Sequence, residues 1–137
     1  MKWTNIQFGE MEFEEKHILV FPDGLIGFEE TKKYLIVNDE SSEPFRWLVS
    51  LEESDLSFPL LDPLLVDENY ASRYFLQENV TLFAVASIKH RIDDSTVNLK
   101  SPIVIDNVTR HAKQIILDDD GLNVHTPLVS LSSELAE

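Results

Sequence analysis

The segment at residues 80–88 constrains the fold more than any other part of the chain. It reads V-T-L-F-A-V-A-S-I, with apolar side chains at both phases of a two-residue alternation. A strand of this kind has both faces covered, because successive side chains point to opposite sides of a sheet. We therefore expect residues 80–88 to form a central strand inside a barrel or between packed sheets.

Most of the remaining chain also has the pattern of short strands. Residues 3–8 and 11–13 alternate bulky and polar side chains around Gly9, which indicates a bulge or a tight bend there. Residues 56–61 contain Pro59, which predicts an edge strand because proline cannot donate to a sheet ladder. Further apolar runs predict strands at 18–21, 34–37, 45–49, 97–99, 102–106 and 114–117.

The chain has no helical pattern of twelve residues, so we expect only short turns of helix, for example at residues 27–33 and 67–73. The pattern predicts an all-β barrel or sandwich of eight or more strands. No repeat or linker divides residues 1–137, which we expect to form a single domain. After about residue 118 the pattern weakens. Leu128, Leu131 and Leu135 either dock as a short helix or fray.

The charge balance excludes one large class of function. The chain has 25 acidic and 11 basic residues, a formal charge of −14, and its four arginines are scattered. Nucleic-acid binding needs clustered lysine and arginine to neutralise phosphates, so we expect no direct nucleic-acid partner. The acidity serves either solubility alone or the attraction of a basic partner.

The N-terminus and the longest apolar stretch bear on location. Residues 1–7 lack the apolar core and cleavage site of a signal peptide, and residues 82–88 are too few to cross a bilayer. The chain has no cysteine, which fits a reducing compartment and excludes disulfides and thiol catalysis. We expect a cytoplasmic protein with no membrane association.

No motif for catalysis or for a cofactor is present. The histidines at 17, 90, 111 and 125 stand far apart, and there is no G-x-S-x-G, P-loop or G-x-G-x-x-G pattern. The stretch D-D-D-G at 118–121 fails as an EF-hand loop, because Ile116 and Pro127 would take positions one and twelve. We expect a non-enzyme that needs neither metal nor cofactor.

Several stretches, read in order, resemble one known family. Residues 21–28 read F-P-D-G-L-I-G-F, 44–50 read P-F-R-W-L-V-S, and Phe58 precedes an Asp62-Pro63 pair. Residues 96–106 read T-V-N-L-K-S-P-I-V-I-D, and Arg110 precedes Q-I-I-L at 114–117. This ordered set resembles the flagellar assembly factor FliW family. Departures are small: Ser101, Asp106 and the pair at 111–112 stand where alanine, asparagine and a glycine are usual.

The resemblance implies a small antiparallel β-barrel with short connecting helices. It also implies a partner-switching function, in which the protein binds and antagonises the translational repressor CsrA and binds newly made flagellin. Within the F-P-D-G-L-I-G-F segment we expect architecture first, with Gly24 and Gly27 at turns and Phe21 and Phe28 as core anchors.

The connection after the proline-bearing strand is our candidate protein-binding surface. It combines acids with apolar and aromatic groups, as a small interface with a polar rim does. An ordinary solvated connection is the alternative. The candidate residues are Asp62, Pro63, Leu65, Asp67, Glu68, Asn69 and Tyr70.

Two functions of other classes remain open on the sequence. A ligand-binding or hydrolytic small barrel would need an apolar pocket with converging titratable groups. A structural flagellar component would have to polymerise, against which the acidity and the proline-bearing edge argue.

Overall fold

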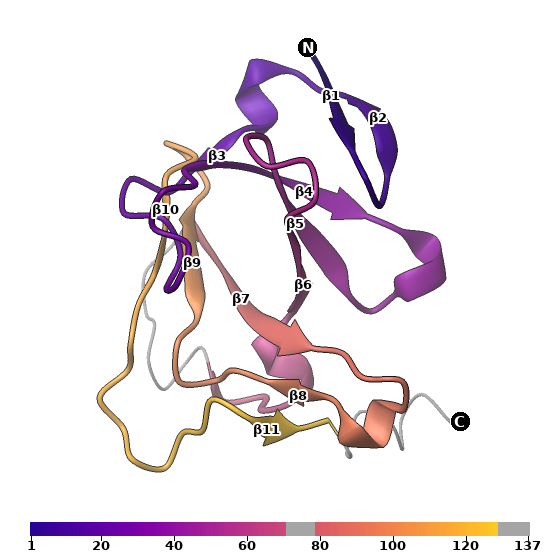
Figure 1. The fold of residues 1–137 in the computed structure, drawn as a ribbon. Coiled ribbons are helices and arrows are strands. Elements are labelled where there is room, and N and C mark those ends of the chain that lie inside the picture. The colour runs from indigo at the N-terminus through magenta and orange to yellow at the C-terminus, as the bar shows by residue number, and fades with distance from the viewer. Residues whose placement is uncertain (71–78, 129–137) are drawn as a thin grey trace.

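The computed structural model describes residues 1–70 and 79–128, and this part of the chain is all-β (Figure 1). Single 3₁₀ turns lie at Glu15–His17, Glu40–Ser42, Pro63–Leu65 and Ile92–Asp94. Of the short helix predicted at 67–73, Tyr70 is helical and residues 71–73 lie outside the described residues. The strands are β1 (Lys2–Asn5), β2 (Gly9–Glu12), β3 (Leu19–Val20), β4 (Lys33–Asn38), β5 (Arg46–Ser50), β6 (Ser57–Leu61), β7 (Val80–Ser87), β8 (Thr96–Val97), β9 (Ile103–Asp106), β10 (Ala112–Gln114) and β11 (Thr126–Pro127).

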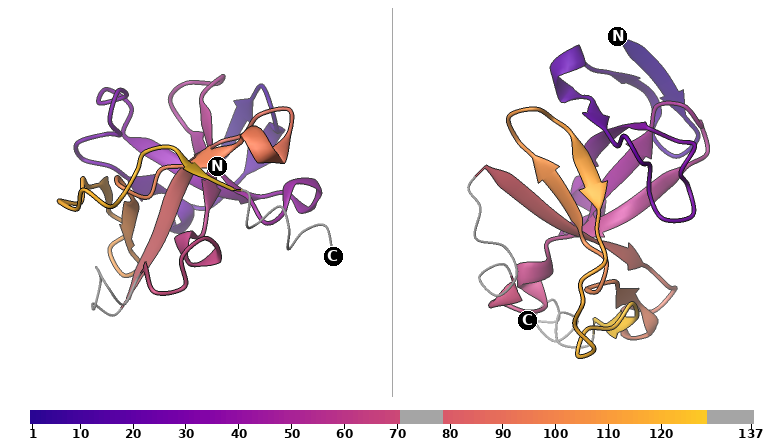
Figure 2. Two further views of the ribbon diagram at one scale, coloured as in Figure 1. Left: turned by 90° about the horizontal axis from the view of Figure 1, so that it is seen from below. Right: turned by 90° about the vertical axis from the view of Figure 1, so that its left-hand side faces the viewer.

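The strand β7 organises the main sheet, which confirms the prediction for residues 80–88. The sheet has the order β10-β9-β7-β6-β5-β4-β3, and β8 and β11 extend from β7. The first half of β7 pairs with β9, through registers such as Thr81↔Ile105, and its end pairs with β8 through Ala86↔Val97. All of these pairings are antiparallel. The strands wind around one another and do not lie in flat layers (Figure 2).

The expected barrel does not close, so that part of the fold prediction was wrong. The two ends of the strand order, β3 and β10, share no ladder and meet only through one isolated bridge between Val20 and His111. The bridge includes the bond from the Val20 N–H to the Arg110 carbonyl, at 3.0 Å. Pro22, two residues after Val20, has no N–H to continue the pairing. We call this junction between β3 and β10 the seam.

The turn that leads from β9 into the seam is held by one carboxylate. The Asp106 Oδ1 accepts hydrogen bonds from the backbone N–H groups of Val108 and Thr109, at 2.9 and 3.1 Å. These bonds lower the pKa of Asp106. Asp106, which stands where the resembled family usually has asparagine, therefore caps the turn with its side-chain oxygen. Arg110 ends the turn in the left-handed region, at φ +64°, and its Nη2 donates to the His17 carbonyl at 3.3 Å.

The loop of the F-P-D-G-L-I-G-F segment spans the seam. The side chain of Gln114 joins its two sides, because its Oε1 accepts from the Ile26 N–H and its Nε2 donates to the Ser101 carbonyl, both at 3.0 Å. Gly24 is required in this loop, since it has φ +69° and a Cβ there would lie 2.6 Å from the Glu29 Cα. The segment 27–33 forms turns and the start of β4, with no helix, so the helical turn predicted there was wrong.

Two buried clusters fill the interior, on opposite sides of β6 and β7. Leu60 and Phe83 belong to the first cluster, with Phe21 and Tyr34, whereas their neighbours Leu61 and Ala84 belong to the second. The second cluster also contains Phe45, Tyr70, Val97, Leu99 and Leu128. Consecutive strand residues thus bury both faces, as the apolar pattern predicted.

Two predictions around these clusters were wrong. Phe28 is 41% exposed and is no core anchor, although Phe21 is fully buried as expected. The strand β6 lies between β5 and β7 and is not at an edge. Its ladder with β7 covers only Leu60 and Leu61, so Pro59 lies in the half of β6 that has a neighbour on one side. Proline is tolerated there as it is at an edge, because no strand on that side needs a backbone N–H as a donor.

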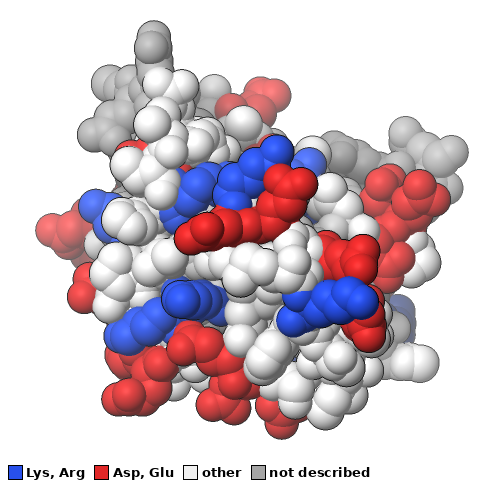
Figure 3. Space-filling view, turned by 90° about the horizontal axis from the view of Figure 1, so that it is seen from above, with Lys and Arg blue, Asp and Glu red and all other residues white. Residues whose placement is uncertain are grey.

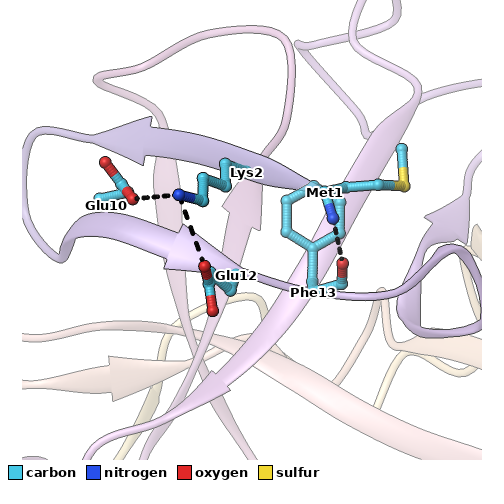
Figure 4. Close-up of polar contacts among 5 residues, drawn as sticks. All are labelled: Met1, Lys2, Glu10, Glu12 and Phe13. Carbon is cyan, nitrogen blue, oxygen red and sulfur yellow. Dashed lines mark hydrogen bonds and ion pairs between the residues drawn. The ribbon is translucent and has the colours of Figure 1, made fainter.

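The hairpin β1–β2 lies at the opposite end of the molecule from β8 and β11 (Figure 1). The Met1 amino group donates to the Phe13 carbonyl at 2.9 Å, and the Lys2 Nζ lies 3.5 and 3.6 Å from carboxylate oxygens of Glu10 and Glu12 (Figure 4). Such exposed ion pairs contribute about 0–1 kcal/mol each. Gly9 makes the expected bend, at φ +73°.

The end of the described chain is ordered by pairing and burial. Thr126–Pro127 pairs with β8, and Leu128 is fully buried in the second cluster. Leu131 and Leu135 of the predicted tail lie outside the described residues. Among the residues described, no helix is long and apolar enough to cross a membrane.

Gln114→Ala tests the role of the seam. The substitution removes the hydrogen bond across the seam, to the Ile26 N–H, and the bond to the Ser101 carbonyl. We expect the free energy of unfolding to fall by about 1–2 kcal/mol. Urea denaturation measures the change. Lys113→Ala, an exposed neighbour on β10, is the matched control and should change stability by under about 0.5 kcal/mol. Equal effects of the two substitutions would contradict this role for Gln114.

Tyr34 gives the fold a dependence on alkaline pH. It is fully buried, and burial, reinforced by the negative charges of Glu52 and Glu53, raises its pKa from the ordinary tyrosine value of 10.0 to about 12. The stability that comes from keeping Tyr34 protonated is present below pH 10 and is lost as the pH rises towards 12. In urea unfolding at pH 8 and pH 11, Tyr34→Phe should lose less stability than the wild type between the two values.

Candidate protein-binding surface

The connection after β6 is held in shape by its own acidic side chains. The Asp62 Oδ1 accepts a hydrogen bond from the Leu64 N–H at 2.9 Å and so caps the turn Pro63–Leu65. Proline at the first position of such a turn leaves no N–H unsatisfied. Further along, the Asp67 Oδ1 accepts from the Asn69 N–H at 3.1 Å. The connection therefore presents a defined shape to solvent.

Burial divides the seven predicted residues into three groups. Pro63 is buried, and Tyr70 is fully buried with its hydroxyl donating to the Leu99 carbonyl. These two residues anchor the connection and are not available to a partner. Asp67 is half-buried. The exposed residues of the predicted set are Asp62, Leu65, Glu68 and Asn69.

The structure adds two residues that the sequence analysis missed. Leu64 is 42% exposed beside Leu65 at 41%, because the tight 3₁₀ turn buries neither leucine. Arg46 comes from β5, whose register Arg46↔Leu60 brings it to the start of the connection. Strand register is a long-range property, so no local signal in the sequence could have placed Arg46 here.

A pocket of about 330 Å³ lies beside the connection. Arg46, Asp62 and Leu65 line it together with Pro44 and residues 81–83 of β7. The Arg46 guanidinium lies 5.7 Å from the centroid of the Phe83 ring, a cation–π distance. The pocket thus offers an aromatic ring, an aliphatic side chain and one charge of each sign, which suits the recognition of a protein side chain.

The described lining of this pocket offers groups for non-covalent contacts. Asp62, the carboxylate among its described lining residues, already accepts a backbone hydrogen bond, and no histidine lines the pocket. Tyr34 and Asp106, whose pKa values are shifted, lie away from this pocket, in the core and in the β9–β10 turn. Within residues 1–70 and 79–128, no three His, Asp or Glu side chains are grouped closely enough to hold a metal ion.

Charges of both signs are interspersed on the face shown in Figure 3. Lysine and arginine side chains there lie beside aspartate and glutamate and do not form a continuous basic patch. The ion pairs of Lys2, Lys16 and Arg91 with neighbouring carboxylates have the same character. Electrostatically, this face does not resemble a phosphate-binding surface.

Comparison with known proteins identifies the family. The model of the family described as "FliW protein" matches residues 2–128. The chain belongs to the FliW family. The resemblance of the ordered sequence motifs is therefore confirmed.

Individual FliW relatives agree over nearly their whole length. The flagellar assembly factor FliW of Natranaerobius thermophilus is 36% identical over 139 aligned residues, which cover 93% of this chain and 92% of the relative. The flagellar assembly factor FliW of Thermosipho africanus is 34% identical, and the alignment covers 93% of this chain and 96% of that relative. A crystal structure of the flagellar assembly factor FliW superposes with a TM-score of 0.82 at 28% identity, over 93% of this chain and 96% of the other. These findings support a function in flagellar assembly.

Tyr70→Phe tests how the connection is anchored. Removing the hydroxyl leaves the Leu99 carbonyl without this donor, and we expect a loss of about 1–2 kcal/mol in the free energy of unfolding. We also expect faster amide hydrogen exchange in residues 62–70. Tyr34→Phe, measured at pH 8, is the control, because it removes a buried hydroxyl far from the connection. Unchanged exchange in residues 62–70 would contradict the anchoring role.

Proposed function

We propose that this FliW-family chain is a cytoplasmic partner-switching adaptor. It binds a CsrA-type translational repressor and antagonises it, and it also binds flagellin, so that flagellin synthesis is coupled to flagellar assembly. The family match over residues 2–128 carries this proposal. The anchored and partly apolar connection at 62–70 supports it, since it offers a preformed contact surface.

The switch needs only competing binding equilibria. When unassembled flagellin accumulates, it occupies the adaptor and releases the repressor, which then stops further flagellin synthesis. A ligand can shift such an equilibrium only by its own differential affinity. The proposed switch involves no covalent step.

The proposed contact surface consists of the exposed residues of the connection and its pocket. Leu64 and Leu65 supply apolar area, and Asp62, Glu68, Asn69 and Arg46 supply a polar rim. Pro63 and Tyr70 support this surface from beneath and Asp67 shapes it, so little conformational entropy is lost when a partner binds.

The acidity of the chain favours a basic partner. A net charge of −14 accelerates the encounter with a positively charged protein and disfavours acidic competitors. Its contribution to affinity is smaller, because charges at an exposed rim are screened over about 10 Å at ordinary salt. A repressor that binds RNA through basic residues fits this requirement.

The double substitution Leu65→Ser/Glu68→Lys tests the contact surface. It removes apolar area and reverses one charge without touching Asp62, Asp67 or the buried anchors. We expect the Kd for the purified CsrA-type repressor, for flagellin, or for both to rise by about tenfold or more. The matched control is Val108→Ser/Glu15→Lys, which makes the same kinds of change at exposed sites.

Calorimetric titrations with each partner, and with flagellin added to the preformed repressor complex, separate the parts of the proposal. Release of the repressor by flagellin is the expected result. If neither partner binds the wild-type chain, the function is wrong. If the double variant binds both as the wild type does, the contact surface is wrong but the function stands.

A further inference from the structure

The hairpin of β1 and β2 has one edge that no described strand covers. Among the described strands these two pair only with each other, and they form a sheet of their own at one end of the molecule (Figure 1). The outer side of β1 is partly occupied, because the Ile6 N–H beside it donates to the Ser54 carbonyl at 2.8 Å. The outer side of β2 has no such contact within the described chain. We call the outer side of Gly9–Glu12 the β2 edge.

The register shows which backbone groups of β2 point outward. Met1 and Phe13 form a hydrogen-bonded pair, because the nitrogen of each donates to the carbonyl of the other, at 2.9 and 3.0 Å. Hydrogen-bonded and non-hydrogen-bonded pairs alternate along an antiparallel ladder. In this register Glu10 and Glu12 belong to pairs of the second kind. Their N–H and C=O groups therefore point away from β1, to the β2 edge.

The β2 edge is bounded at both ends by N–H groups that are already bonded. The Phe8 N–H donates to the Asn5 Oδ1, and the Glu14 N–H donates to the His17 Nδ1, both at 3.1 Å. Between them, no described group accepts from the outward N–H groups of β2. The edge thus suits a short extended segment, in which two residues pair directly with β2 and one residue lies between them.

The side chains along the β2 edge alternate between acidic and apolar. Glu10 and Glu12 are exposed on one face of the hairpin, whereas Met11 is half-buried on the other face, opposite Trp3. Lys2 approaches the Oε1 atoms of both glutamates from β1, at 3.5 and 3.6 Å (Figure 4). A carboxylate has a second oxygen with which to accept. A basic residue on a further strand, directly opposite each glutamate, would therefore add a favourable cross-strand pair.

The same acids select against a second copy of the chain. Glu10, Glu12 and Glu14 follow one another at intervals of two residues. When two β2 edges pair antiparallel about Glu10, Met11 or Glu12, a glutamate stands directly opposite a glutamate, and like charges in that position are destabilising. Charged side chains are a common protection of free edges. Here the outward positions carry one sign of charge, so the edge is protected against its own copies and open to a basic strand.

We propose that the β2 edge accepts an extended segment of another protein as a third, antiparallel strand. The residues opposite Glu10 and Glu12 would be lysine or arginine, and the residue between them, opposite Met11, would be apolar. Backbone hydrogen bonds would hold the segment, and the cross-strand ion pairs would select it. This surface goes beyond the proposed function, since it shares no residue with the 62–70 connection and its pocket.

The first test uses a fluorescently labelled heptapeptide that alternates lysine and valine and has blocked ends. In the proposed register its lysine residues turn their backbone N–H groups to β2, and its valine residues turn theirs away. Two further peptides carry backbone N-methyl groups, one at the lysines and one at the valines. Fluorescence anisotropy should show binding about tenfold weaker or more for the peptide methylated at its lysines, and within about threefold for the other.

The second test changes the protein. Glu12→Pro removes an outward N–H while sparing the ladder with β1, and it should weaken binding about tenfold or more. Thr4→Pro, at the exposed outward position of β1, is its matched control and should stay within about threefold. Glu10→Gln/Glu12→Gln keeps the backbone and should weaken binding about fivefold. Glu29→Gln/Glu30→Gln removes as much charge at exposed sites elsewhere and should stay within about twofold.

Three results would overturn the proposal. Equal binding of the three peptides would show attraction by charge alone. Equal effects of Glu10→Gln/Glu12→Gln and Glu29→Gln/Glu30→Gln would place the peptide elsewhere, and this pair decides if either proline variant melts at a lower temperature. A wild-type dimer in sedimentation that Glu12→Pro converts to a monomer would make a second copy of the chain the occupant.

Discussion

The structure depends on how the two ends of one long antiparallel sheet meet. β3 and β10 are separated by most of the chain and share a single bridge at Val20 and His111. An open seam beside an apolar interior would expose unpaired backbone groups. The seam is covered because the loop of residues 21–28 lies across it. The Gln114 side chain joins this loop to the segment before β9. The two motifs at residues 21–28 and 114–117 are thus linked structurally, because a hydrogen bond joins them across the seam.

The second requirement is that one layer of strands serves two interiors. In β6 and β7, neighbouring residues such as Leu60 and Leu61 point into different clusters, so neither face of these strands can carry a polar pattern. The proposed contact surface consequently lies in a connection and not on a strand face. The 62–70 connection is anchored in the second cluster through Tyr70.

The sequence predicts the features that depend on neighbouring residues better than those that depend on residues far apart in the chain. The apolar pattern of residues 80–88 and the turns at Gly9 and Gly24 are local, and all three predictions are confirmed. The prediction of a closed barrel was wrong because closure depends on how segments about 90 residues apart meet. No local sequence pattern reports on that meeting. Phe28 was wrongly predicted as buried because the sequence of an irregular loop does not show which aromatic ring turns outward.

The candidate surface shows the same limit. The mixture of acids and apolar residues at 62–70 is visible in the sequence, but the distinction between the anchors Pro63 and Tyr70 and the exposed Leu65 and Glu68 is not. An irregular connection has no period from which burial could be read. Arg46 joined the surface only through the register of β5 and β6.

The burial of Leu128 has a consequence for biosynthesis. The first cluster draws its buried members from residues 19 to 112, whereas the second needs Leu128 to be complete. During synthesis from the N-terminus, the half of the molecule that carries the seam can assemble while the half beneath β8 still lacks its last apolar side chain. A nascent chain of this kind would therefore acquire the fully anchored 62–70 connection only after residue 128 has been synthesised.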